Sequence, residues 1–239
     1  MGKDVIIACD FPSKETCLEF LDKFPNDKQM FLKIGMELFY AAGPDLIREI
    51  KGRGHRVFLD LKLHDIPNTV ESAMAVLAKL NVDMVNVHAS GTKKMLEAAL
   101  RGLERGCEGM KRERPILIAV TQLTSTDEER MRADLLIDRD IQEVVEHYAA
   151  MTKEAGLDGV VCSPLESSAV HERLGKDFLT VTPGVRFKDD AKGDQARVMT
   201  PEEARKAGSD YIVMGRPITA AASPLNAYIR ACEDFIDVN

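Results

Sequence analysis

A TIM (β/α)8 barrel is the fold that this sequence predicts. Short runs rich in Val, Ile and Leu alternate with longer amphipathic stretches, which is typical of β/α units around a parallel sheet. Eight such runs occur in 239 residues, a length that suits one barrel. No low-complexity tract or long linker divides the chain, so we expect one barrel domain over residues 1–239. A doubly wound sheet is the lesser alternative.

Each expected strand is a short apolar run that ends in a polar or glycine-containing segment. In chain order the strands are VIIACD (5–10), MFLKIG (30–35), RVFLDLKLH (56–64), MVNVHA (84–89), ILIAVTQL (116–123), GVVCS (159–163), FLTVTPG (178–184) and YIVMGR (211–216). Amphipathic stretches predict the helices, for example KETCLEFLDKF after the first strand, TVESAMAVLAKL after the third and PEEARKAG before the eighth. Strand and helix therefore alternate along the whole chain, as a barrel requires.

Charge and cysteine content argue against several classes of function. The net charge of −7 and the absence of a basic run disfavour nucleic acid as the main partner. Five widely spaced cysteines without a CxxC pair indicate neither a disulfide framework nor a zinc site. The apolar run before Asp10 is too short for a signal peptide or a membrane span, so we expect a cytoplasmic protein.

Polar residues gather where the predicted strands end, which is where barrels of this kind carry their chemistry. The set comprises Asp10, Lys33, Asp60, Lys62, His88, Thr121, Thr124, Ser163, Arg186 and Arg216. Taken alone, Asp10 or Ser163 is as easily explained as a turn or cap residue, and His88 as a hydrogen-bonded core side chain. Lys33 interrupts an apolar strand, where a purely structural lysine is uncommon. Together these residues predict a pocket at one end of the barrel.

The stretch FLDLKLHDIPNTV, residues 58–70, combines a buried strand with three charged side chains. Asp60 and Lys62 are two residues apart, so on a strand they face the same way and can share a site. Asp65 has the opposite parity and lies beyond the strand. It must reach that site by a bend in the chain, or else point into a neighbouring subunit. A buried ion pair that only closes the barrel is the structural alternative.

Glycine and arginine recur after the last two predicted strands, in VTPGVR (181–186) and MGRPITAAASP (214–224). Barrels of this type commonly bind phosphate at these two positions. Gly215 would let the backbone approach an oxyanion, and Arg216 and Arg186 would supply forked cations. The polar stretch 187–200 between the arginines is a candidate lid, in which we expect Gln195 to contact the ligand.

These motifs together resemble the bacterial orotidine 5′-monophosphate decarboxylase family. The matching segments, in the family's order, are FLKIGMELF, DLKLHDIPNT with its D-x-K-x-x-D core, VTQLTS, VTPGVR, the glutamine of GDQARV, and VMGRPI. The likeness covers nearly the full chain. The motif around residues 60–69 is highly specific, whereas the GR and PGVR elements are specific only in its company.

The resemblance implies a homodimeric lyase, without metal or cofactor, that converts orotidine 5′-monophosphate to uridine 5′-monophosphate and carbon dioxide in pyrimidine synthesis. It implies that Lys62 is the proton donor, that Asp60 lies beside the substrate carboxylate, and that Asp65 reaches in from the partner subunit. It assigns the remaining contacts to Asp10 and Lys33 at the ribose, Thr69 in the segment closing the site across the dimer, Thr124 at the pyrimidine, and Arg186, Gln195, Gly215 and Arg216 at the phosphate.

Two alternatives remain open at this point. A related sugar-phosphate decarboxylase or aldolase shares the D-x-K-x-x-D strand but uses Mg²⁺, and the resembling enzymes place an acidic residue at the end of the second strand. This chain has Lys33 there, which would repel the ion. The second alternative is a non-catalytic protein that binds a phosphate ligand on the same barrel. Asp60 and Lys62 argue against it, because ligand binding alone gives no reason to bury them.

Overall fold

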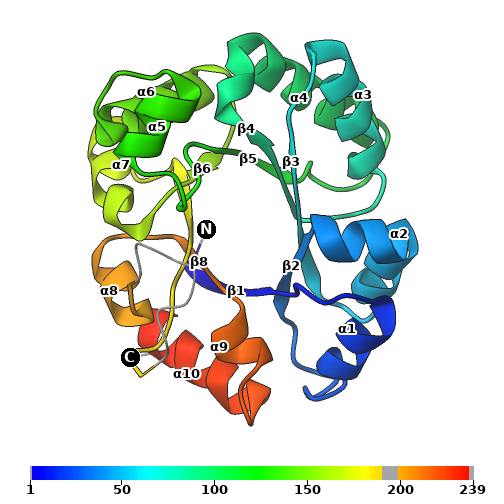
Figure 1. Ribbon diagram of the computed structural model, residues 1–239. Helices are drawn as coiled ribbons and strands as arrows, with labels where there is room; N and C mark the ends of the chain where they lie inside the picture. The colour runs from blue at the N-terminus through cyan, green and yellow to red at the C-terminus, as the bar shows by residue number, and fades with distance from the viewer. Residues whose placement is uncertain (1, 190–198, 237–239) are drawn as a thin grey trace.

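The computed structural model is a closed barrel of parallel strands inside a ring of helices, and it describes residues 2–189 and 199–236 (Figure 1). Each strand pairs with the next one in the chain, and β8 pairs with β1 to close the barrel. The strands are β1 (Asp4–Ala8), β2 (Phe31–Gly35), β3 (Arg56–Leu63), β4 (Met84–His88), β5 (Ile116–Val120), β6 (Gly159–Val161), β7 (Leu179–Pro183) and β8 (Tyr211–Met214). The predicted fold class is confirmed, because strand order equals chain order rather than that of a doubly wound sheet.

Helices lie between the strands and cover the outside of the barrel (Figure 1). They are α1 (Lys14–Leu21), α2 (Met36–Gly52), α3 (Pro67–Ala78), α4 (Thr92–Cys107), α5 (Glu128–Leu135), α6 (Ile141–Glu154), α7 (Ser167–Leu174), α8 (Pro201–Lys206), α9 (Arg216–Thr219) and α10 (Pro224–Ile236), with single 3₁₀ turns at Ala89–Gly91 and Pro164–Glu166. Within the described residues, no helix combines the length and apolar character that a membrane span needs.

Most strands end earlier than the sequence predicts. β5, for example, ends at Val120 rather than at residue 123, and β8 ends at Met214 rather than at residue 216. The polar residues that follow leave the hydrogen-bonded ladder and line a pocket instead. The prediction failed at these ends because composition marks where a segment is buried, and not where its backbone stops pairing.

Alternate strand residues belong to separate apolar clusters, as the pleat of a strand requires. One cluster fills the barrel and consists of Ile6, Ala8, Phe31, Phe58, Met84, Ile116, Ile118, Val181, Tyr211 and Val213. The largest cluster packs most of the outer strand faces against the helices, and a smaller third one packs β6 against α6 and α7. The Arg56 guanidinium lies 4.0 Å from the centre of the Phe31 ring and binds Asp4 at 2.9 Å. These contacts close the amino-terminal end of the barrel, which leaves the other end for a site.

Aspartates fix the amino-terminal ends of neighbouring strands. Those that precede β4, β6 and β8 each accept a hydrogen bond from the second residue of the strand before: Asp83 from the Val57 amide (2.7 Å), Asp158 from the Leu117 amide (2.7 Å) and Asp210 from the Thr180 amide (2.8 Å). Each carboxylate also binds a basic side chain, namely Lys51, Arg114 and His171 respectively. This repeated contact sets where each strand pair begins.

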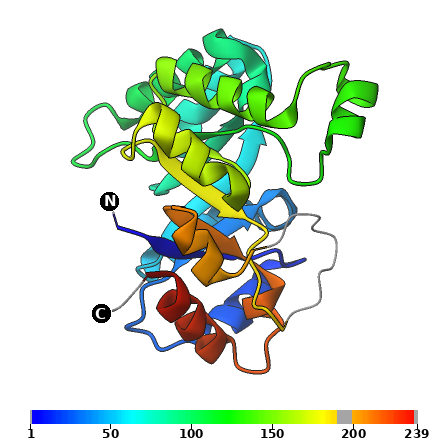
Figure 2. The same ribbon diagram turned by 90° about the vertical axis from the view of Figure 1, so that its left-hand side faces the viewer.

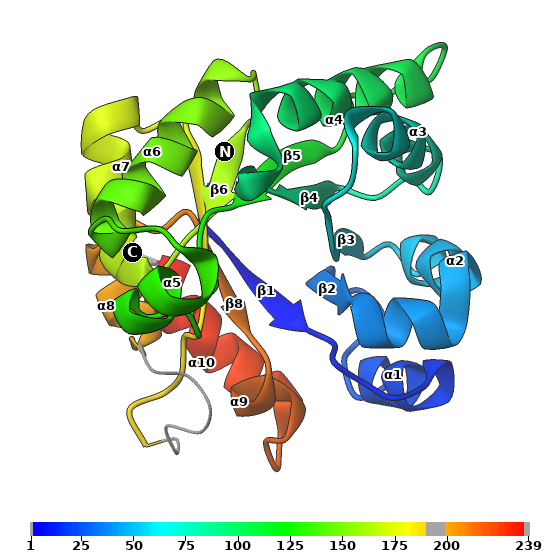
Figure 3. The same cartoon turned by 45° about the horizontal axis from the view of Figure 1, so that its top comes forward.

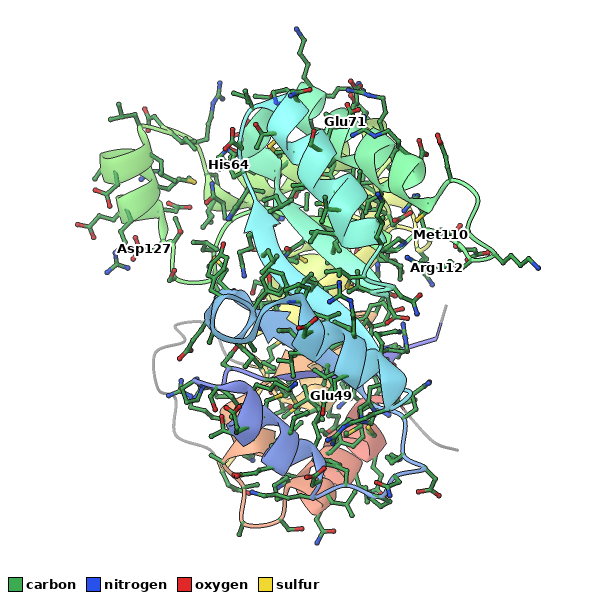
Figure 4. The ribbon with its side chains drawn as sticks, turned by 90° about the vertical axis from the view of Figure 1, so that its right-hand side faces the viewer. Glu49, His64, Glu71, Met110, Arg112 and Asp127 are labelled. Atoms are coloured by element: carbon green, nitrogen blue, oxygen red, sulfur yellow. The ribbon has the colours of Figure 1, made fainter. Side chains whose placement is uncertain are left out.

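The two ends of the barrel differ in side view. His64, directly after β3, and Asp127, just before α5, lie at the carboxyl end of the strands, whereas Met110 and Arg112, in the turn before β5, lie at the opposite end (Figure 4). Helix α5 projects from the ring at the carboxyl end (Figure 2). The carboxyl end is thus the more elaborated one, as expected for the face that carries a site.

Helices α3 and α4 pack unusually close together, side by side at the edge of the barrel (Figure 3). A Cβ atom on Gly102 of α4 would lie 2.2 Å from the Glu71 carbonyl oxygen of α3, and one on Gly106 would lie 2.6 Å from the Ala75 carbonyl oxygen. Only glycine therefore permits this approach. Because α3 follows β3 and α4 follows β4, the contact fixes the two strands on which the site described below depends.

We expect Gly102→Ala to lower the free energy of unfolding by about 1–3 kcal/mol, because the new methyl group must push α4 away from the α3 backbone. Gly52→Ala is the matched control, since a Cβ at this exposed helical position meets nothing within 4 Å. The control should be neutral or stabilising by up to about 1 kcal/mol. Urea denaturation of both variants is the measurement, and equal stability of the two would contradict the packing argument.

Candidate functional site

A cavity of about 350 Å³ opens at the carboxyl end of the barrel. Its floor is apolar and is formed by Ala8, Phe58, Val120, Val161, Val181 and Val213. Its walls carry charged and polar side chains from the ends of β1, β2, β3, β5, β7 and β8. The size is that of a small-molecule site, and the combination of a dry floor with a few convergent polar groups is typical of one.

Four side chains of alternating charge form one wall of the cavity. Lys33 Nζ lies 3.0 Å from Asp10 Oδ1 and 3.3 Å from Asp60 Oδ2. Lys62 Nζ lies 2.6 Å from Asp60 Oδ1. The strand ends of β1, β2 and β3 thus bring together residues that are far apart in the chain, in the order Asp10, Lys33, Asp60, Lys62.

These four side chains differ in their access to solvent. The side chains of Asp60 and Lys33 are 9% and 12% exposed, whereas those of Lys62 and Asp10 are 26% and 60% exposed. Asp60 is therefore the most buried side chain of the group, and the more exposed Lys62 ammonium that it binds lines the cavity. A ligand above the apolar floor would meet that ammonium.

Mutual attraction keeps the two buried members of this group charged. Burial acts to lower the pKa of Lys33, but Asp60 and Asp10 outweigh burial, and the pKa lies above its usual value. Burial likewise acts to raise the pKa of Asp60, but Lys33, Lys62 and the hydrogen bond from Asn86 outweigh it, and the pKa lies below its usual value. Both groups are therefore ionised at neutral pH.

Gly35, at the end of β2, leaves room for the first ion pair. A Cβ atom at this position would lie 3.3 Å from Asp10 Oδ1 and 3.4 Å from Lys33 Nζ. Such contacts are tighter than side chains normally accept, so a larger residue would displace the pair. The glycine of the FLKIG strand thus leaves space for the Asp10–Lys33 pair.

Asn86 of β4 completes the group, and the sequence analysis missed it. Its side chain donates from Nδ2 to Asp60 Oδ1 at 2.6 Å and accepts from the Lys62 backbone amide at 2.8 Å. The residue is 1% exposed. A signal was present in the sequence, because an amide interrupts the apolar strand MVNVH at the same parity as His88. Asn86 lies two residues before the end of β4, so the gathering of polar residues after the strand ends does not reveal it.

His88 and His64 border Lys62, and their rings lie 5.7 Å apart between centres. Burial, with His64 and Lys62 nearby, lowers the pKa of His88 below its usual value. The His88 side chain is therefore neutral at neutral pH and adds no further cation beside Lys62.

The opposite wall of the cavity contains the residues predicted to bind phosphate. Gly215, Arg216 and Pro217 follow β8, and Arg186 follows β7; all four line the cavity. Arg186 is buried, at 8% exposure, whereas Arg216 is exposed. Thr124, after β5, also lines the cavity. Seven further predicted residues thus line the same cavity as Lys62, namely Asp10, Lys33, Asp60, Thr124, Arg186, Gly215 and Arg216.

Asp65 and Thr69 do not line this cavity in a single chain. Both residues are exposed, and Asp65 Oδ1 accepts from the neighbouring Ile66 amide at 2.6 Å. The sequence left open whether Asp65 bends into the cavity of its own chain or points into a neighbouring subunit. In this structure the chain does not bend Asp65 into its own cavity. Gln195 and most of the candidate lid, residues 190–198, lie outside the described residues.

Comparison with known proteins places these features in a family. Residues 3–231 match the model of the family described as "Orotidine 5'-phosphate decarboxylase / HUMPS family". The chain is 56% identical over 228 residues to orotidine 5′-phosphate decarboxylase of Bacillus cytotoxicus, and 55% identical over 228 residues to that of Bacillus mycoides. Each of these alignments covers 95% of both proteins.

Solved structures agree with the sequence comparison. A crystal structure of orotidine 5′-phosphate decarboxylase from Lactobacillus acidophilus has a TM-score of 0.88 at 41% identity, over 98% of this chain and 99% of the other. A structure of an uncharacterized conserved protein from Geobacillus kaustophilus has a TM-score of 0.86 at 49% identity, over 97% of this chain and 99% of the other.

The depressed pKa of Asp60 predicts a specific pH dependence of stability. A carboxyl whose pKa is lower in the folded protein adds stability above its unfolded pKa and loses that stability as the pH falls through the folded pKa. At neutral pH we expect Asp60→Asn to lower the free energy of unfolding by on the order of 3 kcal/mol, since two ammonium groups lose their shared partner. This difference should be constant above about pH 5 and shrink as the pH falls below the ordinary value of 3.8.

Urea denaturation of the parent and the variant between about pH 3 and pH 7 measures this difference. Asp45→Asn is the matched control, because Asp45 forms an ion pair with Arg48 but is 81% exposed. Its effect should be close to zero throughout. A pH-independent difference for Asp60→Asn would show that the carboxylate charge does not stabilise the folded site.

Proposed function

The chain belongs to the orotidine 5′-phosphate decarboxylase / HUMPS family, and we propose that it is a carboxy-lyase that converts orotidine 5′-monophosphate to uridine 5′-monophosphate and carbon dioxide. We further propose that it does so in the cytoplasm, in de novo pyrimidine biosynthesis. One observation carries the proposal, namely the Lys62 ammonium held at 2.6 Å on a buried carboxylate, in a cavity whose far wall carries Arg186 and Arg216.

The chemistry of this substrate requires such an ammonium. When the bond between C6 and the carboxylate breaks, the electron pair stays on C6 in an sp² orbital that the ring carbonyls cannot delocalise. The site must then stabilise the charge electrostatically, and fixed charges above a dry floor do this best. We propose that Lys62 Nζ stabilises the developing carbanion and then protonates C6. Carbon dioxide leaves, and solvent returns a proton to the Lys62 amine.

The other residues of the cavity are proposed to bind and orient the substrate. Asp60 would lie beside the substrate carboxylate, and Asp10 and Lys33 would hold the ribose. The remaining roles are Thr124 at the pyrimidine, and Arg186, Gln195, Gly215 and Arg216 at the phosphate. Phosphate binding far from C6 lets the enzyme use that binding energy to order the site around the reacting carbon.

Lys33 favours this reaction over that of a Mg²⁺-dependent sugar-phosphate enzyme. A magnesium site needs oxygen ligands, but the end of β2 carries the Lys33 ammonium. Burial acts to lower the pKa of Lys33, but Asp60 and Asp10 outweigh burial, and the pKa lies above its usual value. Lys33 therefore stays charged and occupies the carboxylates that a metal would need. We propose that the reaction proceeds without a metal or other cofactor.

A homodimer is proposed because part of the predicted site faces away from the cavity. Asp65 and Thr69 are exposed, as is Ile66 between them, at 66%. Tyr40 and Met36 of α2 are 74% and 46% exposed. Burial of these apolar side chains by another protein would stabilise the association. We propose that a second copy covers them and receives Asp65 and Thr69 into its own cavity.

We expect chelator-treated protein to consume orotidine 5′-monophosphate, and Lys62→Ala to be slower by on the order of 10³-fold or more, because the variant lacks the proton donor. Loss of the orotate ultraviolet absorbance follows the reaction. Lys206→Ala is the matched control and should keep the parent rate, since Lys206 forms an ion pair with Glu202 at 2.7 Å on the exposed side of α8. No reaction with the parent protein would refute the proposed activity.

The position of Asp65 is tested by mixing two inactive variants. Lys62→Ala and Asp65→Ala chains, dissociated and reassembled in equal amounts, should recover about one quarter of the parent activity. The reason is that half of the dimers are mixed, and each mixed dimer holds one cavity with Lys62 and the partner's Asp65. Each variant reassembled alone serves as the control. If the mixture is no more active than its components, Asp65 does not act across an interface.

A further inference from the structure

We propose that Asn86 is a positioning residue that sets both the backbone and the side chain of Lys62. The inference rests on the proposed function, because it concerns the reaction in which Lys62 acts. Asn86 does not line the cavity. It belongs to β4, which among the described residues is the one strand that contributes nothing to the cavity lining. It acts on the cavity only through its neighbours.

The β3–β4 pairing shows why a side chain is needed at this point. Leu59 pairs with Val85, but the next pair is Leu63 with Val87, so the register shifts between them. Asp60, Leu61 and Lys62 of β3 lie in this irregular segment. The Lys62 amide is bonded to the Asn86 side-chain oxygen at 2.8 Å, in place of a main-chain carbonyl of β4. Where the β3–β4 pairing is interrupted, the Asn86 side chain thus supplies the hydrogen-bond acceptor for the Lys62 amide.

Lys62 also adopts a backbone conformation that residues with a side chain seldom adopt. Its φ is +50°, in the left-handed region. Such a conformation persists only where the surroundings hold it, and it is found preferentially at functional sites. The bond from the Lys62 amide to Asn86 fixes this turn of the chain and, with it, the direction in which the lysine side chain leaves the strand.

The second Asn86 bond orients the partner of the ammonium. Asn86 Nδ2 donates to Asp60 Oδ1 at 2.6 Å, and the same oxygen accepts from Lys62 Nζ at 2.6 Å. The amide orientation follows from chemistry, because an ionised carboxylate only accepts and a backbone amide only donates. A single amide therefore holds the two ends of the Asp60–Lys62 pair, the carboxylate and the lysine backbone.

Removal of this amide should slow turnover without weakening binding. We expect Asn86→Ala to lower kcat by about 10²-fold, the scale of a displacement of a reacting group by about 1 Å, with little change in KM. Arg186 and Arg216, the proposed phosphate contacts, follow β7 and β8, which do not pair with β4. Thr182→Val is the matched control, since Thr182 is fully buried on β7 and its hydroxyl donates to the Tyr211 carbonyl at 3.1 Å. The control should keep the parent kcat.

The variant Asn86→Asp tests the positioning role separately from packing. Aspartate has nearly the same shape as asparagine, so the variant changes the hydrogen bonding and charge of the side chain and not its volume. The introduced carboxyl would contact Asp60 and the Lys62 amide of β3. Lys33 of β2 lies at the other Asp60 oxygen, and His88, with His64 beside it, lies near Asp60 and Lys62. Two carboxylates this close raise each other's pKa, so the pair shares a proton at the lower end of the pH range. With one proton between them, the new carboxyl can donate to Asp60 and accept from Lys62 as the amide did.

We therefore expect the ratio of Asn86→Asp kcat to parent kcat to fall as the pH rises and the shared proton is lost. A purely structural role gives a ratio that does not change with pH. The proposal is overturned by a flat ratio, by parent-like kcat in Asn86→Ala, or by an equal loss in Thr182→Val.

A crystal structure of Asn86→Ala provides a readout that does not depend on activity. Lys62 should leave the positive φ region, and its Nζ should move away from Asp60; an unchanged Lys62 backbone would refute the positioning role. If the parent does not decarboxylate orotidine 5′-monophosphate, the proposed function fails, while this structure still decides whether Asn86 positions Lys62.

Discussion

The carboxylate of Asp60 binds side chains from three neighbouring strands of the barrel, β2, β3 and β4. Lys62 Nζ and Asn86 Nδ2 bond to one of its oxygens, and Lys33 Nζ lies beside the other. The Asp60 carboxylate is buried, so it is tolerated as an ion only because these donors surround it. Lys33 in turn stays charged because Asp60 and Asp10 are near. Removal of Asp60 would take away the carboxylate that Lys33 and Lys62 share, so the register of β2, β3 and β4 must be held closely.

The two ends of the barrel meet this demand in different ways. At the amino end, Asp83 accepts from the Val57 amide and binds Lys51, which anchors the start of the β3–β4 pair. The close packing of α3 on α4 at Gly102 holds the same pair from outside. Regular pairing then extends to Leu59 and stops. The irregular segment that carries Asp60 and Lys62 is therefore supported by ordered contacts below it, and the strained backbone at Lys62 can be maintained.

The sequence predicted the parts of this molecule that depend on pattern. Eight apolar runs predicted the eight strands, and the polar residues at their ends predicted most of the cavity wall, because parallel strands in a barrel share one carboxyl end. The parity argument placed Asp60 beside Lys62, and they do lie together, although through an irregular strand that parity does not describe. Asn86 was missed although an amide interrupts the apolar strand MVNVH, because its role depends on a register shift that this local pattern does not reveal. Asp65 and Thr69 face outward in one chain, so their part in the site stays a prediction that a second chain must test.

The distribution of charge in the cavity also favours one orientation of a ligand that carries a phosphate. Arg186 and Arg216 attract the phosphate, whereas the wall with Asp10, Lys33, Asp60 and Lys62 carries two positive and two negative charges. With the phosphate on the arginine wall, a carboxylate at the other end of the same ligand is directed towards Lys62 and Asp60. In the proposed reaction, that negative charge moves from the departing carboxylate onto the ring carbon, while the Lys62 ammonium stays fixed on Asp60. Because the protein holds this pair in place by its own contacts, the site need not reorganise as the charge moves, and this is the condition under which fixed charges favour a transition state most.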